Sequence, residues 1–330
     1  MTRLAIIGAG LAGLTLARRL SNNAKITVFE KSRGVSGRLS TRRLGDFEFD
    51  HGAQFFTARS KSFQQFLKPF IDEGVVAEWS PRVTTLSPTA KPFKREWFEP
   101  HYVAVPRMNS LCKIIASSLD LQLNTAVTKL EQKDEGWIVH TEGSTRPETF
   151  DWVISTAPVE QTLTLFGKHL SDSLPAEDIA LDQACMSPCF TLMLGLKVLP
   201  EIHFDAAKVN DSCLEWIMVN SSKPGRTALP TLVIQSTNAW AQEHLEADEQ
   251  WIVDQMLEDL EKVLPQSLPP VETHALHRWL YARVETPLKP DFLIDHTQQL
   301  AACGDWWVHG RVEGAFHSAL SLARVLESHL

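Results

Sequence analysis

The pattern of apolar and polar positions is most regular in the N-terminal segment. An apolar run at 4–7 predicts a buried parallel strand, and apolar residues at helical spacing from 11 to 20 predict an amphipathic helix. A second apolar run at 26–29 predicts another strand. The chain therefore opens with a strand, a helix and a strand, the unit from which parallel sheets are built.

The remaining pattern indicates more strands of that sheet and a second group of elements. Residues 152–158 and 300–303 predict further parallel strands, and the alternation at 121–140 predicts a strand pair with a turn at 134–136. Other segments fit strands at 189–196 and 232–236, and helices at 63–70, 111–119, 251–264 and from 312 onward.

Glycines follow the first strand in a pattern that indicates dinucleotide binding. Gly8 permits a tight turn, Gly10 lets a pyrophosphate approach the backbone, and Gly13 lets the helix lie close to the sheet. Leu11 and Ala12 place free amides at the helix N-terminus, where phosphates bind. Glu30 ends the second strand, where its carboxylate can bind an adenosine ribose with a free 2′-hydroxyl.

A second glycine loop follows immediately and has the composition of a phosphate contact. Lys31 begins it, Gly34 and Gly37 give it freedom to turn, and Arg38 provides a guanidinium for a pyrophosphate oxygen.

The segment from Glu30 to Arg42 resembles the second motif of the flavin amine oxidase superfamily. Three further stretches are similar to the bacterial renalases within it: Asp-His-Gly-Ala-Gln-Phe-Phe-Thr-Ala-Arg at 50–59, His-Arg-Trp-Leu-Tyr-Ala at 277–282, and Gly304-Asp305 followed by Gly-Arg-Val-Glu-Gly-Ala at 310–315. The resemblance extends over the whole chain, although the common Ser-Gly ending of the last motif is replaced by residues 317–319, His-Ser-Ala.

The resemblance implies an α/β fold of two lobes, like p-hydroxybenzoate hydroxylase and the amine oxidases. One lobe would be a doubly wound, Rossmann-type FAD-binding domain made of residues 1–59, 101–158 and 285–330. The other would be an α+β substrate domain made of residues 60–100 and 159–284.

The resemblance also implies FAD as the cofactor. We expect non-covalent binding, because Cys303 lies in the strand before Gly304 and not in a recognised flavin-linking motif. The backbone near Val127 would contact the adenine end, Asp305 would hold the ribityl chain, and the helix from Val312 would point its N-terminus at flavin N1 and the C2 carbonyl. The expected cofactor-binding residues are Gly8, Gly10, Leu11, Ala12, Gly13, Glu30, Lys31, Gly37, Arg38, Gln54, Phe55, Val127, Gly304, Asp305, Arg311, Val312, Glu313 and Ala315.

Renalases oxidise 2- or 6-dihydro isomers of NAD(P)H by hydride transfer to FAD N5, and O2 then reoxidises the flavin to give H2O2. No proton must be removed, so no catalytic side chain is expected. No metal is expected either, because no His lies near Cys185 and Cys189 in a ligand pattern. An aromatic wall suits a planar pyridine, and an arginine suits a phosphate or carboxamide. The expected substrate contacts are Phe55, Phe56, Thr57, Thr191, His277, Trp279, Tyr281 and Arg311.

Two other functions remain open. One is a flavin-dependent oxidase of a small amine, although the chain has only Tyr102 and Tyr281 for the aromatic cage that such enzymes favour. The other is a binding protein that has lost its flavin, which the intact Gly10, Glu30 and Arg38 oppose.

Composition excludes several other classes. The chain of 330 residues is 44% hydrophobic and 22% charged with a net charge of −8, which argues against nucleic acid or an anionic membrane as partner. No apolar run reaches the roughly 18 residues of a membrane span, and the first strand begins at residue 4, so we expect no signal peptide and a cytoplasmic location. The five cysteines show no CxxC pair, which indicates neither disulfides nor zinc.

Overall fold

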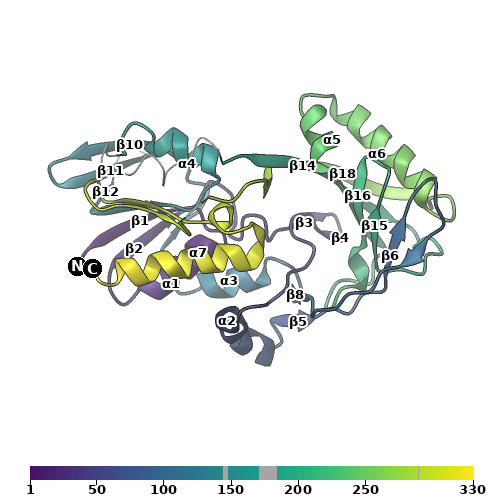
Figure 1. The fold of residues 1–330 in the computed structure, drawn as a ribbon, viewed down its shortest axis with the longest axis horizontal. Helices are drawn as coiled ribbons and strands as arrows, with labels where there is room; N and C mark the ends of the chain where they lie inside the picture. The colour runs from purple at the N-terminus through teal and green to yellow at the C-terminus, as the bar shows by residue number, and fades with distance from the viewer. Residues whose placement is uncertain (144–147, 171–183, 289) are drawn as a thin grey trace. The chain divides into compact units, whose positions relative to one another are not determined.

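The computed structural model describes residues 1–143, 148–170, 184–288 and 290–330. The chain forms two compact units (Figure 1). Unit 1 consists of Met1–Arg38, Cys112–Met186 and Arg283–Leu330, and unit 2 of Leu39–Leu111 and Ser187–Ala282. The mixed α/β class expected from the sequence is confirmed.

A six-stranded sheet in the order β19-β20-β13-β1-β2-β9 forms the centre of unit 1. All its pairings are parallel except that of β19 with β20. The expected strands at 4–7, 26–29, 152–158 and 300–303 are confirmed as neighbours in it. Its strands are β1 (Arg3–Ile7), β2 (Lys25–Phe29), β9 (Leu121–Gln122), β13 (Trp152–Ser155), β19 (Leu293–Asp295) and β20 (Leu300–Ala302).

Two long helices, α1 (Leu11–Leu20) and α7 (Arg311–Leu326), lie side by side in unit 1 (Figure 1). Gly13 allows α1 to approach the sheet, because a Cβ there would overlap the Gly8 carbonyl oxygen. A small antiparallel sheet contains the strand pair expected at 121–140. The other elements of this part of the chain are α3 (Ser110–Ala116), β10 (Val127–Lys133), β11 (Gly136–Thr141), β12 (Glu148–Phe150), α4 (Val159–Phe166) and the 3-10 turn η3 (Asp305–Trp307).

Unit 2 is built on a seven-stranded sheet in the order β18-β14-β17-β16-β15-β6-β7. Every residue of β14 is buried, as expected for a strand covered on both faces. The strands are β6 (Val83–Leu86), β7 (Phe93–Lys94), β14 (Met186–Leu196), β15 (Ala206–Val209), β16 (Leu214–Val219), β17 (Thr231–Ser236) and β18 (Val271–Val284).

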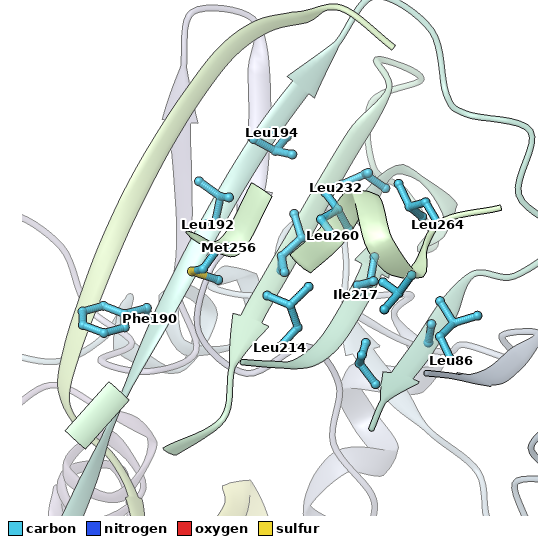
Figure 2. Packing of buried hydrophobic residues seen from close by; sticks show 14 of the residues in the cluster. Leu86, Phe190, Leu192, Leu194, Leu214, Ile217, Leu232, Met256, Leu260 and Leu264 are labelled. Carbon is cyan, nitrogen blue, oxygen red and sulfur yellow. The ribbon is translucent and has the colours of Figure 1, made fainter. Parts of the chain in front are cut away.

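The core of unit 2 packs this sheet against α5 (Asn238–Glu243) and α6 (Glu249–Val263). Figure 2 shows Met256 and Leu260 of α6 among Leu192, Leu214 and Ile217 of the strands. The Asp248 carboxylate caps the start of α6 by accepting hydrogen bonds from the second and third amides that follow it. The unit is therefore a sheet with one apolar face covered by helices.

Two short antiparallel pairs and a helix complete unit 2. The hairpin of β3 (Thr41–Leu44) and β4 (Phe47–Asp50) belongs to this unit, whereas we expected residues up to 59 in the FAD domain. The reason is local, since Asn220 Nδ2 donates to the Glu48 carbonyl at 3.0 Å and ties the hairpin to unit 2. Residues 101–111 also lie in unit 2, and the described part of 159–186 lies in unit 1. The remaining elements are α2 (Lys61–Asp72), β5 (Val76–Glu78), β8 (Tyr102–Ala104) and the 3-10 turn η2 (Asn220–Ser222).

Within the described ranges, no helix has both the length and the apolar character needed to cross a membrane.

Candidate flavin and substrate sites

The glycine turn of unit 1 leaves room where a phosphate would lie. Gly8 has φ +105° and lies under Thr156, so its conformation and its surroundings both favour glycine. Gly10 has φ −77°, which any residue can adopt, and a Cβ there would meet nothing within 4 Å. The backbone conformation does not explain why position 10 is a glycine, whereas the close approach of a ligand to the backbone would. The Gly10 N-cap makes no side-chain hydrogen bond to the amides of α1.

Glu30 is buried at the end of β2, and its carboxylate faces the glycine turn. One carboxylate oxygen accepts from the Ala9 amide at 2.9 Å and the other from the Ser32 amide at 2.8 Å. The Thr125 amide donates to the Glu30 carbonyl at 2.9 Å, which brings the segment leading to Val127 to the same place. A ribose bound at Glu30 would therefore lie near residues 9, 32 and 125.

The second glycine loop lies against the first. The Ser36 amide donates to the Ala9 carbonyl at 2.8 Å, and a Cβ on Gly37 would lie 3.5 Å from the Gly10 Cα. Arg38 makes a two-pronged ion pair with Asp305, in which Nη1 donates to Oδ2 at 2.9 Å. Three segments that are distant in sequence thus meet in unit 1, and Lys31 lies exposed beside them.

The start of α7 lies next to Asp305. The Gly310 amide donates to the Asp305 carbonyl at 2.8 Å, and Gly314 must be glycine because a Cβ would overlap the Val308 carbonyl oxygen. Ser318, at the departure from the common motif, is fully buried and donates to the Asp291 carbonyl while accepting from the Gly304 amide at 2.9 Å. Ser318 therefore helps to fix Gly304. Arg311 is exposed at the first turn, with Val312, Glu313 and Ala315 half-buried beside it.

These observations fit a bound dinucleotide. Open space over Gly10, free amides at the start of α1, the Glu30 carboxylate and the Arg38 guanidinium occupy one region of unit 1 and match the phosphate and ribose ends of FAD in chemistry.

In unit 2, the 50–54 loop consists of the last residue of β4 and the irregular segment that follows it, and side chains bind the carbonyl groups of residues 50, 51 and 52. Gln54 Nε2 donates to the carbonyls of Asp50 and Gly52. Gln235 of β17 also donates to the Gly52 carbonyl, at 3.0 Å, and Trp279 Nε1 donates to the His51 carbonyl at 2.8 Å. Both donors of the Gln54 amide are therefore used within the protein.

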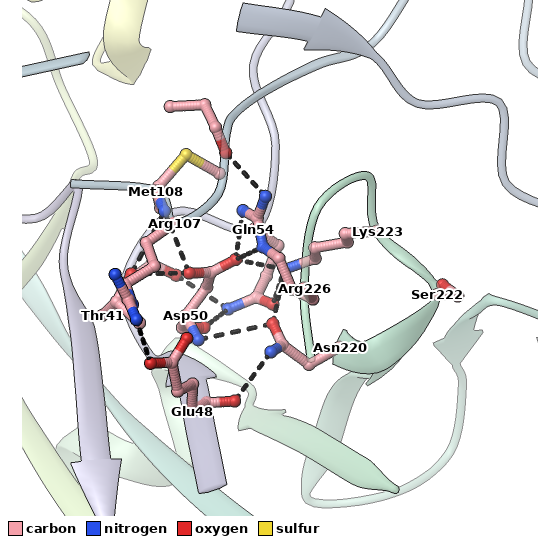
Figure 3. A network of polar contacts seen from close by, with 12 residues as sticks. Thr41, Glu48, Asp50, Gln54, Arg107, Met108, Asn220, Ser222, Lys223 and Arg226 are labelled. Carbon is pink, nitrogen blue, oxygen red and sulfur yellow. Dashed lines mark hydrogen bonds and ion pairs between the residues drawn. The ribbon is translucent and has the colours of Figure 1, made fainter. Parts of the chain in front are cut away.

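Asp50 is the anion at the centre of the contacts in Figure 3. Arg226 donates to its Oδ2 at 2.6 and 3.1 Å, Lys223 Nζ lies 3.3 Å from the same oxygen, and Thr41 and the Met108 amide bind Oδ1. Burial acts to raise the pKa of Asp50, but the charges of Lys223 and Arg226 hold it below its usual value. Burial lowers the pKa of Lys223 to about 8.

His51, His277 and Trp279 form an aromatic group, the His51 group, near the start of this loop. The His51 ring stacks on Trp279 with centroids 5.3 Å apart and meets His277 edge-on at 4.9 Å. Burial, followed by the charges of His277 and Arg42, lowers the pKa of His51 to about 4. Burial and Arg42 also lower the pKa of His277. Both imidazoles are therefore neutral at pH 7.

The low pKa of His51 predicts a loss of stability in mild acid. Unfolded histidine binds a proton near pH 6.5 and folded His51 only near pH 4, so its contribution is present above pH 6.5 and declines as the pH falls toward 4. We expect this to cost about 2 kcal/mol at pH 5 relative to pH 7. Urea denaturation at both pH values should show a smaller difference for His51→Phe, whereas His203→Phe at an exposed site should match the parent protein. If His51→Phe lost as much stability between pH 7 and pH 5 as the parent protein, the low pKa of His51 would be contradicted.

The other expected substrate residues of unit 2 lie in several different surroundings. Phe55 is half-buried in an aromatic group, 4.7 Å from the Trp97 ring and 4.8 Å from His101. Phe56 is buried against Tyr102 and Phe63, and the structure does not bring its ring to the His51 group. Thr191 is fully buried in β14 opposite Gln235, and Thr57 is half-buried in the loop after Phe56. Tyr281 shares the face of β18 that carries His277 and Trp279.

Sequence reasoning missed the residues that hold the 50–54 loop, namely Asn220, Lys223, Arg226 and Gln235. Residues 220–226 have the composition of a solvated turn, with Ser, Lys, Pro and Gly in succession. A lysine between two strands gives no local sign of burial, but an acid such as Asp50 in a buried motif does indicate that cations lie nearby.

In the described ranges no three His, Cys, Asp or Glu side chains gather in a way that could hold a metal ion.

Comparisons with known proteins agree with this description. A profile described as "NAD(P)-binding Rossmann-like domain" matches residues 6–70, and one described as "Flavin containing amine oxidoreductase" matches residues 100–326. Renalase of Mus musculus is 26% identical over the full length of both chains. A 4,4′-diapophytoene desaturase of Staphylococcus aureus is 31% identical over 20% of this chain and 15% of its own.

Solved structures show the same fold. A putative protoporphyrinogen oxidase from Exiguobacterium sp. 255-15 superimposes with a TM-score of 0.81 at 12% identity, covering 100% of this chain and 99% of its own. A redesigned putrescine oxidase superimposes with a TM-score of 0.74 at 12% identity, with the same coverage of both chains.

The fold and the dinucleotide-binding segments define an FAD-dependent oxidoreductase. The chain belongs to the flavin-containing amine oxidoreductase family, and its full-length similarity to renalase agrees with the resemblance found in its motifs.

Proposed function

We propose that this oxidoreductase is renalase-like and oxidises 2- or 6-dihydro isomers of NAD(P)H to NAD(P)+, with O2 as the final acceptor and H2O2 as the second product. Written as a balance, the dihydronicotinamide, O2 and one proton give the aromatic nicotinamide and H2O2. The bound FAD would accept the hydride at N5 and pass both electrons to O2.

The electrostatics of the His51 group carry the proposal. The imidazoles of His51 and His277 are uncharged at pH 7, and the positive charge of Arg42 acts on both. An ammonium substrate would be repelled there, whereas a neutral dihydropyridine ring with an anionic pyrophosphate would not. The stacked ring of Trp279 adds a planar apolar surface suited to a pyridine.

The residues of the chain would bind and orient rather than transfer protons. The Glu30 carboxylate, Arg38 and the α1 amides would hold the adenosine and pyrophosphate of FAD, and Asp305 with the start of α7 would hold its flavin end. His277, Trp279 and Phe55 would orient the substrate ring. Because hydride loss makes that ring aromatic, placement and exclusion of water would supply most of the rate.

The deciding experiment is anaerobic stopped-flow mixing of the purified flavoprotein with borohydride-reduced NAD+, which contains 2-, 4- and 6-dihydro isomers. We expect this mixture to bleach the flavin band rapidly and pure 4-dihydro NADH to bleach it slowly or not at all. Equal bleaching by both would contradict the proposal. Bleaching by neither would do so too, and a panel of small amines would then test the amine oxidase alternative.

Arg311→Ala should raise KM for the active isomer about 10- to 100-fold, the worth of one hydrogen bond to a charged group. Flavin content should fall by a smaller factor than KM rises, because Arg311 is exposed at the start of α7. Arg324→Ala, in the last turn of the same helix, is the matched control and should leave KM unchanged. An unchanged KM in Arg311→Ala would remove this side chain from the substrate site.

A further inference from the structure

Lys223 is a cation with no exposed side-chain surface. Its Nζ lies 2.9 Å from Gln54 Oε1, 3.1 Å from Asn220 Oδ1 and 3.3 Å from Asp50 Oδ2 (Figure 3). These three acceptors engage all three N–H groups of an ammonium ion. The side chain is therefore fully used as a donor, and only in its charged form.

The need to neutralise the charge of Asp50 does not explain why Lys223 is buried beside it. Arg226 already donates two hydrogen bonds to Asp50 and is itself only 2% exposed. The cluster of Asp50, Gln54, Asn220, Lys223 and Arg226 holds one anion and two cations, so Lys223 gives it a net positive charge. Burying a second cation costs free energy. Within this cluster, Lys223 is the residue that donates to Gln54 Oε1.

That contact fixes which way the Gln54 amide points. With its oxygen on Lys223, the amide nitrogen must face the carbonyls of Asp50 and Gly52 and so close the loop on itself. The intervening carbonyl of His51 is bound by Trp279. Three consecutive carbonyl groups, those of residues 50, 51 and 52, are thus held; His51 lies within this segment, and Phe55 directly follows Gln54.

We propose that Lys223 is a positioning residue for the flavin-dependent reaction, which locks Gln54 across the 50–54 loop and thereby sets the places of His51 and Phe55. A neutral amine has two N–H groups and cannot serve three acceptors, so loss of the proton weakens the lock. Lys223 acts through Gln54 and need not touch substrate or cofactor. The inference rests on the proposed function only for the choice of reductant in one of its tests.

The groups facing Lys223 determine the pH at which its ammonium group loses its proton. Asp50 of β4 favours the ammonium form, Arg226 and burial oppose it, and the Trp79 ring lies 5.8 Å from Nζ. Since the pKa of Lys223 is about 8, the lock should loosen as the pH rises through 8. His51 and Asp50 both titrate in acid and cannot produce a change in that range.

Hydrogen–deuterium exchange of the holoprotein tests the lock without any assay of activity. At pH 7, peptides covering residues 48–57 should exchange at least 10-fold faster in Lys223→Met than in the parent. Lys208→Met is the matched control, because Lys208 also pairs with an acid, Glu215, and lies 5.5 Å from a tryptophan ring. Unchanged protection in Lys223→Met, or equal loss in both variants, would overturn the proposal.

Flavin reduction as a function of pH tests the consequence for the reaction. With borohydride-reduced NAD+, the parent should lose its reduction rate with a midpoint near pH 8, and Lys223→Met should be about 10-fold slower at pH 7 with no alkaline decline. A decline that persists in Lys223→Met would overturn the proposal. If the mixture does not reduce the parent protein, the proposed function fails, while the exchange experiment still decides the role of Lys223.

Asn220→Asp provides a variant that keeps Lys223 in place should Lys223→Met retain no flavin. It also removes the Nδ2 donor to the Glu48 carbonyl, so the comparison with the parent uses only the pH of each midpoint. The added carboxylate would face the ammonium group at the 3.1 Å contact and raise its pKa. Both the loss of rate and the loss of exchange protection should then move to a pH about one unit higher. Absence of that shift would overturn the proposal.

Discussion

Gly10→Ala should yield a protein that folds normally but is purified almost without flavin. The φ and ψ of Gly10 suit alanine, and its Cβ would enter space that no protein atom occupies. A methyl group there would stand where the pyrophosphate of FAD must approach the backbone. We expect FAD affinity to fall about 100-fold, equivalent to about 2.7 kcal/mol, measured as flavin absorbance per chain and by titration of the flavin-free protein.

Gly13→Ala, three residues further on, is the control and should destabilise the fold itself. Its Cβ would overlap the backbone oxygen of Gly8, which cannot move without displacing the end of β1. We expect the flavin-free protein to lose about 3 kcal/mol of unfolding free energy in urea, with Gly10→Ala within about 0.5 kcal/mol of the parent. Equal destabilisation by the two variants would show that the fold itself requires glycine at position 10, and an unchanged FAD affinity in Gly10→Ala would show that the space over Gly10 has no role in ligand binding.

Asp50→Asn should destabilise the protein by about 3–5 kcal/mol, the cost of leaving buried cations without their anion. Lys223 and Arg226 are at most 2% exposed, so water cannot replace the lost charge. Urea denaturation at pH 7 gives the measurement. Because the folded pKa of Asp50 lies below its unfolded value, its contribution is complete above about pH 4 and is lost below that.

Asp205→Asn makes the same chemical change at a solvated ion pair. Its partner Arg82 has a side chain 64% exposed, and such pairs are worth less than about 1 kcal/mol. A loss in Asp50→Asn no larger than in Asp205→Asn would mean that the cluster around Asp50 relaxes or admits water on mutation.

Local pattern explains why the strand–glycine turn–helix unit and the place of Glu30 could be predicted from the sequence. The turn after β1 and the position of Glu30 depend on residues that are close in sequence, and each has a steric or hydrogen-bonding requirement that few residue types meet. The pairing of Arg38 with Asp305 spans 267 positions, and periodicity alone would not have found it.

The contacts of the 50–54 loop were beyond local reasoning because they depend on tertiary placement. Phe55 and Phe56 are equivalent in composition, yet one joins the Trp97 and His101 rings and the other packs under Tyr102. The alternation of an extended segment predicts that neighbours face opposite ways but not which of them faces the site. Likewise, nothing near residue 223 marks it as the partner of residue 54, since the two lie 169 positions apart.

The way the chain passes between the two units has a consequence for synthesis on the ribosome. Unit 1 draws its strands from both halves of the chain, and β20 enters the central sheet only at Leu300–Ala302. Until those residues emerge, β13 presents an unpaired edge rich in apolar side chains, which is a template for association with other chains. Nascent protein should therefore depend on chaperones until residues 300–302 have emerged from the ribosome.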